Sequence, residues 1–149
     1  MNSDPIDLAS ALDRFDQLWS PRIVAGVNDY DVRIAKVAGE HVWHSHADTD
    51  EFFLVLDGEL RIALRDAGNS TGNSAGTDTG TGTKGTAERT VVLPRGSIYV
   101  VPRGVEHKPS SADGAAILMF EPTGTSTVGD LRGDVPAHVD AGTGHVLEH

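Results

Sequence analysis

The sequence of 149 residues contains no cysteine, and this absence excludes several kinds of chemistry at once. Without thiols the chain can form no disulfide bond, no cysteine-based zinc site and no thiol nucleophile. Aromatic side chains are also scarce, at 5% of the residues, whereas glycine occurs 17 times. These two figures predict a modest hydrophobic core and many turns. The length fits one domain.

Positive charge and long apolar runs are scarce as well. The 12 Lys and Arg residues stand against 22 Asp and Glu residues, which gives a formal net charge of −10. An acidic surface disfavours nucleic acid and anionic membranes as partners. No apolar run approaches the length of a membrane span, and the first residues lack the basic and apolar pattern of a signal peptide. We therefore expect a soluble, cytoplasmic protein.

A short amphipathic helix is predicted at the N-terminus. Asp4 can cap such a helix and Pro5 suits its first position. Apolar side chains then recur at helical spacing, at Leu8, Leu12, Phe15 and Trp19. The Ser20-Pro21 pair should end the helix. We expect residues 1–20 to form a helix that packs on the body of the domain.

From residue 22 onward the apolar period becomes that of β-strands. Strands are predicted in residues 22–27, 30–38, 41–46, 52–56, 60–64, 89–93, 97–101, 105–108 and 115–121. The Asp57-Gly58 pair favours a tight hairpin between two of them. A chain of many short strands and one helix predicts an all-β sandwich or barrel, which we place at residues 21–122.

Two segments outside these strands have little apolar content. Residues 66–87 consist largely of Gly, Thr, Ser and Asn, so burial cannot offset the entropy of ordering them, and we expect a disordered insertion. The alternative is a substrate lid, although the segment lacks an aromatic or apolar anchor. Residues 123–149 are predicted to be an irregular C-terminal tail. Its last residues, Leu147-Glu148-His149, resemble the beginning of an expression tag.

The clearest chemical signal lies between Gly39 and Gly58. His44 and His46 are two residues apart, so in a strand their imidazoles would point to the same side. Glu51 follows after small and polar residues that allow the chain to turn back. His107 has a similar setting, a short strand entered from a tight turn, and could be a fourth ligand. Three imidazoles and one carboxylate suit a divalent Fe, Mn, Ni, Zn or Co ion, with positions left open for a substrate.

These residues resemble the two sequence motifs of the cupin family. The first motif is filled by Gly39, His44, His46, Glu51 and Gly58, with one residue fewer than usual between Gly39 and His44. The second motif is filled by Gly96, Pro102, Gly104 and His107, with Ser111 where Asn is usual. The resemblance covers residues 22–122. It implies a double-stranded antiparallel β-helix, the cupin or jelly-roll barrel, which holds a metal ion at His44, His46, Glu51 and His107.

Other histidines and one tyrosine have weaker assignments. His41 has the opposite strand parity to His44, so we expect it to face away from the metal. His138 and His145 lie in the C-terminal tail, and we assign them no role. Tyr99 could be an acid or hydrogen-bond donor in the pocket, or a packed aromatic of its strand.

Several further side chains could line the barrel interior. Phe53 and Val55 share the strand parity of Glu51, and we expect them to pack in the core. Arg33, Arg61 and Arg65 could bind a substrate carboxylate if they faced inward. Alternation along the strands more often sends arginine to solvent, which is the prediction here.

Three functions are consistent with this pattern. The first is a metal-dependent enzyme of dioxygenase or isomerase type that acts on a small oxygen-rich substrate, such as an enediol, a catechol-like compound or a keto acid. The second is a metal-bearing domain that binds or senses a small molecule without turnover. The third, a storage role like that of seed cupins, fits the intact ligand set least well. A homodimer could form through residues 52–56, unless the N-terminal helix covers that surface.

Overall fold

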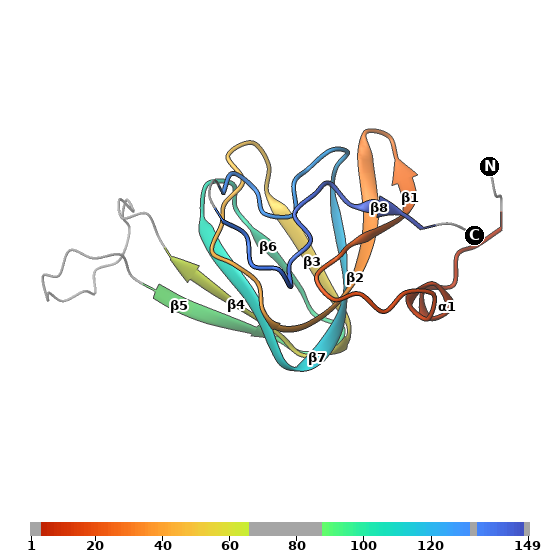
Figure 1. Ribbon diagram of the computed structural model, residues 1–149, viewed down its shortest axis with the longest axis horizontal. Helices are drawn as coiled ribbons and strands as arrows, with labels where there is room; N and C mark the ends of the chain where they lie inside the picture. The colour runs from red at the N-terminus through yellow and green to blue at the C-terminus, as the bar shows by residue number, and fades with distance from the viewer. Residues whose placement is uncertain (1–3, 66–87, 132–133, 148–149) are drawn as a thin grey trace, which may run out of the picture.

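The computed structural model describes residues 4–65, 88–131 and 134–147. Within these ranges the elements, in chain order, are α1 (Leu8–Leu12), β1 (Arg22–Val27), β2 (Tyr30–Glu40), β3 (Glu51–Gly58), β4 (Leu60–Arg65), β5 (Glu88–Leu93), β6 (Ile98–Val101), β7 (Glu106–Pro122) and β8 (His145–Val146). Figure 1 shows the strands wrapped around a common interior, with α1 at one side. The predicted insertion at 66–87 lies outside the described residues, so disorder and a lid both remain predictions.

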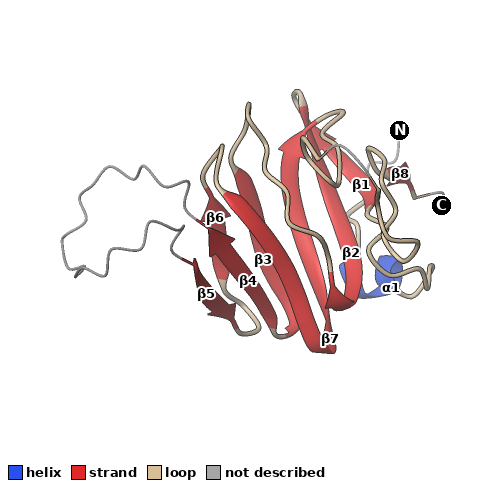
Figure 2. Cartoon of the chain, turned by 60° about the vertical axis from the view of Figure 1, so that its left-hand side comes forward, coloured by secondary structure: helices blue, strands red, loops and turns tan. Residues whose placement is uncertain are grey.

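Strand β7 organises the sheet. One of its edges pairs with β2, and its other edge pairs with β4 and then β3, all antiparallel. Strand β5 extends β4, β6 extends β3, and β1 and β8 continue from β2. The sheet therefore curves round its interior (Figure 2), which confirms the predicted all-β cupin-type barrel. The prediction of separate strands at 105–108 and 115–121 was wrong, because Ser110 and Ser111 stay extended and pair with Glu40 and Gly39.

The barrel interior is filled by alternate residues of these strands. Val55, Leu60, Ile62 and Ile117 are buried almost completely, and Phe53 is 2% exposed. The prediction that Phe53 and Val55 pack in the core is confirmed. Each such aliphatic or aromatic side chain contributes roughly 1.5–3 kcal/mol through removal from water. The packed interior fixes the ends of β3 and β7, where two of the predicted ligands lie.

The N-terminal helix is much shorter than predicted. It spans five residues, Leu8–Leu12, and its N-cap is Asp7, which accepts a hydrogen bond from Ser10 N at 2.9 Å, rather than Asp4. Phe15 and Trp19 lie beyond the end of the helix. They pack into two different clusters of the core, and a single helical face could not reach both clusters. No helix in the described part of the chain has the length and apolar character needed to cross a membrane.

The outer face of the sheet is only partly covered. Leu56 and Leu118 pack against the cluster that contains Phe15 and residues of α1, so the N-terminal segment covers one end of this face. Ile98 and Val100 of β6 remain exposed at 59% and 44%. The homodimer through residues 52–56 therefore remains a prediction. The exposed apolar side chains of this face lie on β6, the strand that pairs with β3.

The C-terminal segment is largely irregular, as predicted, but it is part of the core. Val128 and Val139 are buried in the main cluster, and Leu147 is buried in the second one. The amide of Leu147 also donates to the carbonyl of Ile23 at 3.0 Å. Leu147 therefore packs as part of the fold, and the resemblance of residues 147–149 to the beginning of a tag stays a prediction, with residues 148–149 outside the described ranges.

Candidate metal centre

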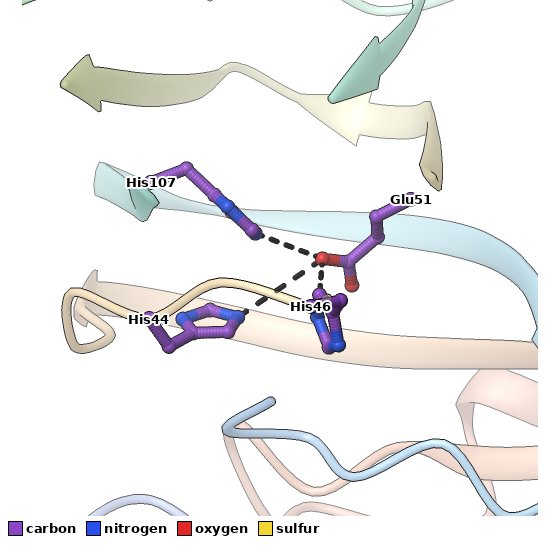
Figure 3. A group of neighbouring side chains, drawn as sticks. All are labelled: His44, His46, Glu51 and His107. Carbon is purple, nitrogen blue, oxygen red and sulfur yellow. Dashed lines mark hydrogen bonds and ion pairs between the residues drawn. The ribbon is translucent and has the colours of Figure 1, made fainter. Parts of the chain in front are cut away.

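The structure brings the four predicted ligands together. Side-chain nitrogen and oxygen atoms of His44, His46, Glu51 and His107 all lie within 4.8 Å of one another, and all four residues are buried. Glu51 begins β3 and His107 lies near the start of β7, whereas His44 and His46 lie in the connection between β2 and β3. Figure 3 shows the three rings directed at one carboxylate oxygen of Glu51.

Backbone hydrogen bonds hold the connection that carries the two histidines. The predicted strand at 41–46 is reduced to a single bridge, in which His44 N donates to His107 O at 3.0 Å and His107 N donates to His44 O at 2.9 Å. The carbonyl of His46 accepts from Gly104 N at 2.8 Å. On the other side, Asp130 N donates to Ser45 O and Ala47 N donates to the Asp130 carboxylate, each at 2.8 Å. The backbone around His46 is therefore fixed from two directions.

Hydrogen bonds to the backbone also set the tautomers of two rings. The Nδ1 atom of His44 lies 2.9 Å from Val42 O, and that of His107 lies 3.0 Å from Val105 O. A carbonyl oxygen only accepts, so each Nδ1 carries the proton and donates it. The lone pair of each ring is then on Nε2, the atom that faces Glu51. This arrangement of outer hydrogen bonds is the one that orients metal-binding histidines in proteins.

The polar atoms of these four side chains are not all paired by hydrogen bonds within the group. The Nε2 atoms of His107, His46 and His44 lie 2.9, 3.0 and 4.0 Å from the same Glu51 oxygen. The Nε2 atom of His46 is buried and, despite its short distance from Glu51, has no hydrogen-bond partner among the residues that the structure describes. A buried polar atom without a partner calls for an explanation such as an ion. Ligands about 2.1 Å from a common metal ion lie about 3 Å apart when adjacent, which matches the two shorter separations.

The electrostatics favour an ionised Glu51. Burial alone would raise the pKa of Glu51, but the neighbouring imidazoles of His107 and His46 outweigh it and hold the pKa well below its usual range. Burial, with the nearby His107, lowers the pKa of His44 to about 3. For His46 the carboxylate of Glu51 outweighs burial and raises the pKa. A carboxylate beside imidazole lone pairs is a donor set for Fe, Mn, Co, Ni or Zn, so a divalent cation fits the site.

His41 does not face away from this site as its parity predicted. The chain leaves β2 at Glu40, so strand alternation no longer applies, and the His41 ring lies with its centroid 4.9 Å from that of His44. Burial lowers the pKa of His41 to about 4, so its ring is neutral at pH 7. It lines a small interior cavity together with His44 and Glu51.

The buried histidines make the stability of the metal-free protein depend on pH. The pKa of His41 is about 4 in the folded state against 6.5 for a free side chain. Between these values the unfolded chain binds more protons, so the free energy of unfolding falls as the pH falls. The free energy of unfolding of wild type relative to that of His41→Phe, measured by urea denaturation, should fall by about 2 kcal/mol from pH 7 to pH 5.

The stabilities of wild type and His41→Phe must be compared at each pH, because Glu121 changes the free energy of unfolding with pH in the opposite direction to His41. Burial and the charge of Glu51 raise the pKa of Glu121 to about 8, so its contribution declines as the pH rises from 4.5 to 8. Both proteins share this term, which cancels in the difference. A stability difference that stays constant from pH 7 to pH 5 would contradict the placement of a neutral His41 in the core.

Arg33 was predicted to face solvent, and that prediction was wrong. Its side chain is 0% exposed and forms ion pairs with Asp31 at 3.0 Å and Glu121 at 3.3 Å. It also donates to Thr125 O at 3.0 Å. Glu121 lines the same interior cavity as His41, so a second buried carboxyl group lies near the four residues. Sequence reasoning missed it, although Glu121 shares the strand parity of the buried Met119.

The remaining candidates lie away from the centre. Arg61 is 52% exposed, and Arg65 lies over the ring of Trp43 at 3.7 Å. Tyr99 is half-buried with its hydroxyl 3.5 Å from Arg89, and it does not line the interior cavity, so its catalytic role remains an unsupported prediction. Ser111, in the motif position usual for Asn, donates to Glu59 O at 2.7 Å and so ties the hairpin end of β4 to β7.

The two histidines of the C-terminal segment have structural contacts of their own. His138 Nε2 lies 2.7 Å from Glu40 O, and His145 Nε2 lies 2.6 Å from the carboxylate of Asp140. Both side chains are exposed and neither joins the group of four. Leaving them without a metal-binding role therefore agrees with the geometry.

Comparison with known proteins supports the fold. No family model matches the chain. The uncharacterized protein YdbB of Bacillus subtilis is 41% identical over 85 residues, which cover 57% of this chain and 70% of YdbB. A cupin-2 domain containing protein of Shewanella frigidimarina is 39% identical with a TM-score of 0.63, and the match covers 78% of this chain and 93% of that one.

A more distant likeness is to an enzyme. Hydroquinone 1,2-dioxygenase PnpCD, solved in complex with Cd²⁺ and 4-hydroxybenzonitrile, has a TM-score of 0.58 and 20% identity. That match covers 83% of this chain and 80% of the dioxygenase chain, and it bears on the fold alone.

Proposed function

The chain belongs to the cupin family, and we propose that it is a metal-dependent enzyme of dioxygenase or isomerase type. In this proposal His44, His46, Glu51 and His107 bind one divalent transition-metal ion. The substrate is a small oxygen-rich molecule, such as a diol or a keto acid. A homodimer through the exposed apolar side chains of β6, Ile98 and Val100, is part of the same proposal.

The observation that carries the proposal is the convergence of three imidazole nitrogens on one buried carboxylate oxygen. Two of the rings have their Nδ1 protons committed to backbone carbonyls, so the Nε2 lone pairs face inward. Within the described ranges of the chain, the Nε2 atom of His46 has no hydrogen-bond partner. A structural zinc site would be closed by four ligands in a rigid tetrahedron, whereas a His₃Glu set is compatible with open positions on a larger coordination sphere.

Residues around the centre can admit and hold a substrate. A surface cleft of about 430 Å³ begins at His46 and is bordered by Asp48, Asp130 and the 122–126 segment. This volume is within the range of small-molecule sites. A bound metal ion would supply Lewis-acid polarisation or dioxygen activation. The chain itself would orient the substrate in the cleft, whose wall includes Thr123 and Thr125. The carboxylate of Glu51 would lower the net charge of a centre holding a divalent ion to about +1.

The test is an oxygen-uptake and product screen of the protein loaded in turn with Fe²⁺, Mn²⁺, Co²⁺, Ni²⁺ and Zn²⁺. The panel consists of diols, catechols and keto acids. We expect turnover with at least one metal, and a loss of at least 100-fold in His44→Ala. The dioxygenase fold neighbour supports the inclusion of phenolic compounds in the panel.

Two outcomes would contradict the proposal in different ways. Full metal content and full activity in His44→Ala would show that the assigned site is wrong. Saturable binding of a panel compound to the metal-loaded protein, without turnover by any metal form, would favour the alternative of a non-catalytic binding or sensing domain.

A further inference from the structure

His41 is a buried histidine whose ring is held in place from two sides. Its centroid lies 5.0 Å from the Trp19 ring and 4.9 Å from the His44 ring, and the residue is 8% exposed. Its backbone amide donates to Pro109 O at 2.9 Å, which fixes the chain at this point. The ring therefore has a defined position beside one of the proposed metal ligands.

The Nδ1 atom of this ring is buried and has no hydrogen-bond partner in the described part of the chain. Leaving a buried polar atom unpaired is costly, and folded proteins rarely do so unless water, an ion or a ligand completes the contact. A leucine or phenylalanine would fill the same space between Trp19 and His44 without this cost. The polar atom thus points to a partner that enters from outside the chain.

The space available to that partner is small. His41 lines an interior cavity of about 30 Å³, which holds one or two water-sized molecules. Trp19, Val37, Phe53 and Met119 form apolar walls, and His44 and Glu51 border the same cavity. A molecule seated there therefore contacts His41 and the proposed metal centre at the same time. Glu121 and Thr127 are further polar residues of the wall.

We infer that His41 is a ligand-binding residue whose Nδ1 holds an oxygen or nitrogen atom of a small molecule seated in this cavity against the metal centre. The inference rests on the proposed function, because it places the molecule beside His44 and Glu51. The occupant is either a separate molecule of two or three atoms, such as water or dioxygen, or the terminal atoms of a larger substrate. In both cases one oxygen or nitrogen atom of the occupant forms a hydrogen bond with His41 Nδ1.

Azide is a suitable probe because it has three atoms and binds to transition metals. The cobalt-loaded protein is titrated with azide and followed by visible absorption, with metal content measured in each sample. His41→Phe, which fills the space and removes the nitrogen, should weaken azide binding about tenfold, as expected for loss of one hydrogen bond. His41→Asn, whose side-chain amide can replace Nδ1, should remain within about threefold of wild type.

His138→Phe is the matched control, since His138 is exposed and lies outside the cavity. It should bind azide as wild type does. A parallel titration with 4-nitrocatechol separates the two kinds of occupant: weakening of azide alone indicates a separate small molecule, and weakening of both indicates the end of a larger substrate. Equal azide affinity in His41→Phe and wild type, each with one metal per chain, would overturn the inference.

A second measurement covers the case in which His41→Phe fails to fold or to take up metal. In the zinc-loaded wild-type protein, addition of azide should shift the ¹⁵N resonance of His41 Nδ1 and leave that of His138 in place. An unchanged Nδ1 resonance at saturating azide would also overturn the inference. Failure of the wild-type protein to bind cobalt or zinc at all is a different result, because it contradicts the proposed function itself.

Discussion

Replacing His107 with alanine is expected to abolish stoichiometric metal binding, with an affinity for Co²⁺ at least 100-fold below that of wild type. His107 is 1% exposed, and its Nε2 lies 2.9 Å from the Glu51 oxygen on which the other rings converge. Even the loss of an outer hydrogen bond to a metal ligand costs 10- to 100-fold, so loss of a ligand should cost more. The measurement is a titration of the metal-free protein with Co²⁺, followed by visible absorption.

The variant should keep its fold, because the hydrogen bonds that join residues 44 and 107 are made by backbone atoms. Far-ultraviolet circular dichroism of the metal-free variant should therefore match that of wild type. The matched control is His138→Ala, which removes an exposed imidazole that contacts the carbonyl of Glu40. Co²⁺ affinity within a factor of three of wild type in a folded His107→Ala protein would remove His107 from the centre.

Replacing Arg33 with methionine is expected to lower the free energy of unfolding by roughly 3–5 kcal/mol at pH 7. The guanidinium is fully buried and donates from Nε and Nη2 to one carboxylate oxygen of Asp31, at 3.3 and 3.0 Å. Without it, Asp31 would keep a buried charge with the hydroxyl of Thr123, at 3.0 Å, as its remaining side-chain donor. An unpaired buried charge is among the most destabilising defects in a protein core. Urea denaturation of the metal-free proteins measures the change.

A double variant tests this reason against simple loss of packing. Arg33→Met combined with Asp31→Asn removes both charges, so it should recover a measurable part of the stability lost in Arg33→Met. Arg61→Met is the surface control: this side chain is 52% exposed and its ion pair with Glu59 should contribute at most about 1 kcal/mol. A loss in Arg33→Met no larger than that in Arg61→Met would contradict the account of the buried pair.

The grouping of the four proposed ligands could be predicted from the sequence because most of its signals are local. His44 and His46 lie on one short segment, Glu51 begins the next strand, and a tight turn precedes His107. The length of α1 could not be predicted in the same way. Leu12 and Phe15 have helical spacing, yet the burial of Phe15 and Trp19 depends on two clusters built from distant strands. Tertiary packing, rather than local propensity, decides where the helix ends.

His41 and Arg33 were misplaced for two different physical reasons. Strand parity fails for His41 because the chain leaves the sheet before this residue. Parity does apply to Arg33, which alternates with Ile34 and shares the inward face with Ala35. There the general preference of arginine for solvent was wrong, because Asp31 compensates its charge inside the barrel and the carbonyl of Thr125 accepts a hydrogen bond from it. Thr125 is far from Arg33 in the sequence, and only the fold shows that the two residues meet.

The central claim is that four side chains hold one divalent transition metal in the barrel. Its most direct test is an anomalous difference map from crystals of the metal-loaded protein, with data collected on both sides of the absorption edge of that metal. We expect one peak per chain, bounded by the Nε2 atoms of His44, His46 and His107 and the carboxylate of Glu51. A map without a peak at these four residues, or with the metal bound elsewhere on the chain, would contradict the account.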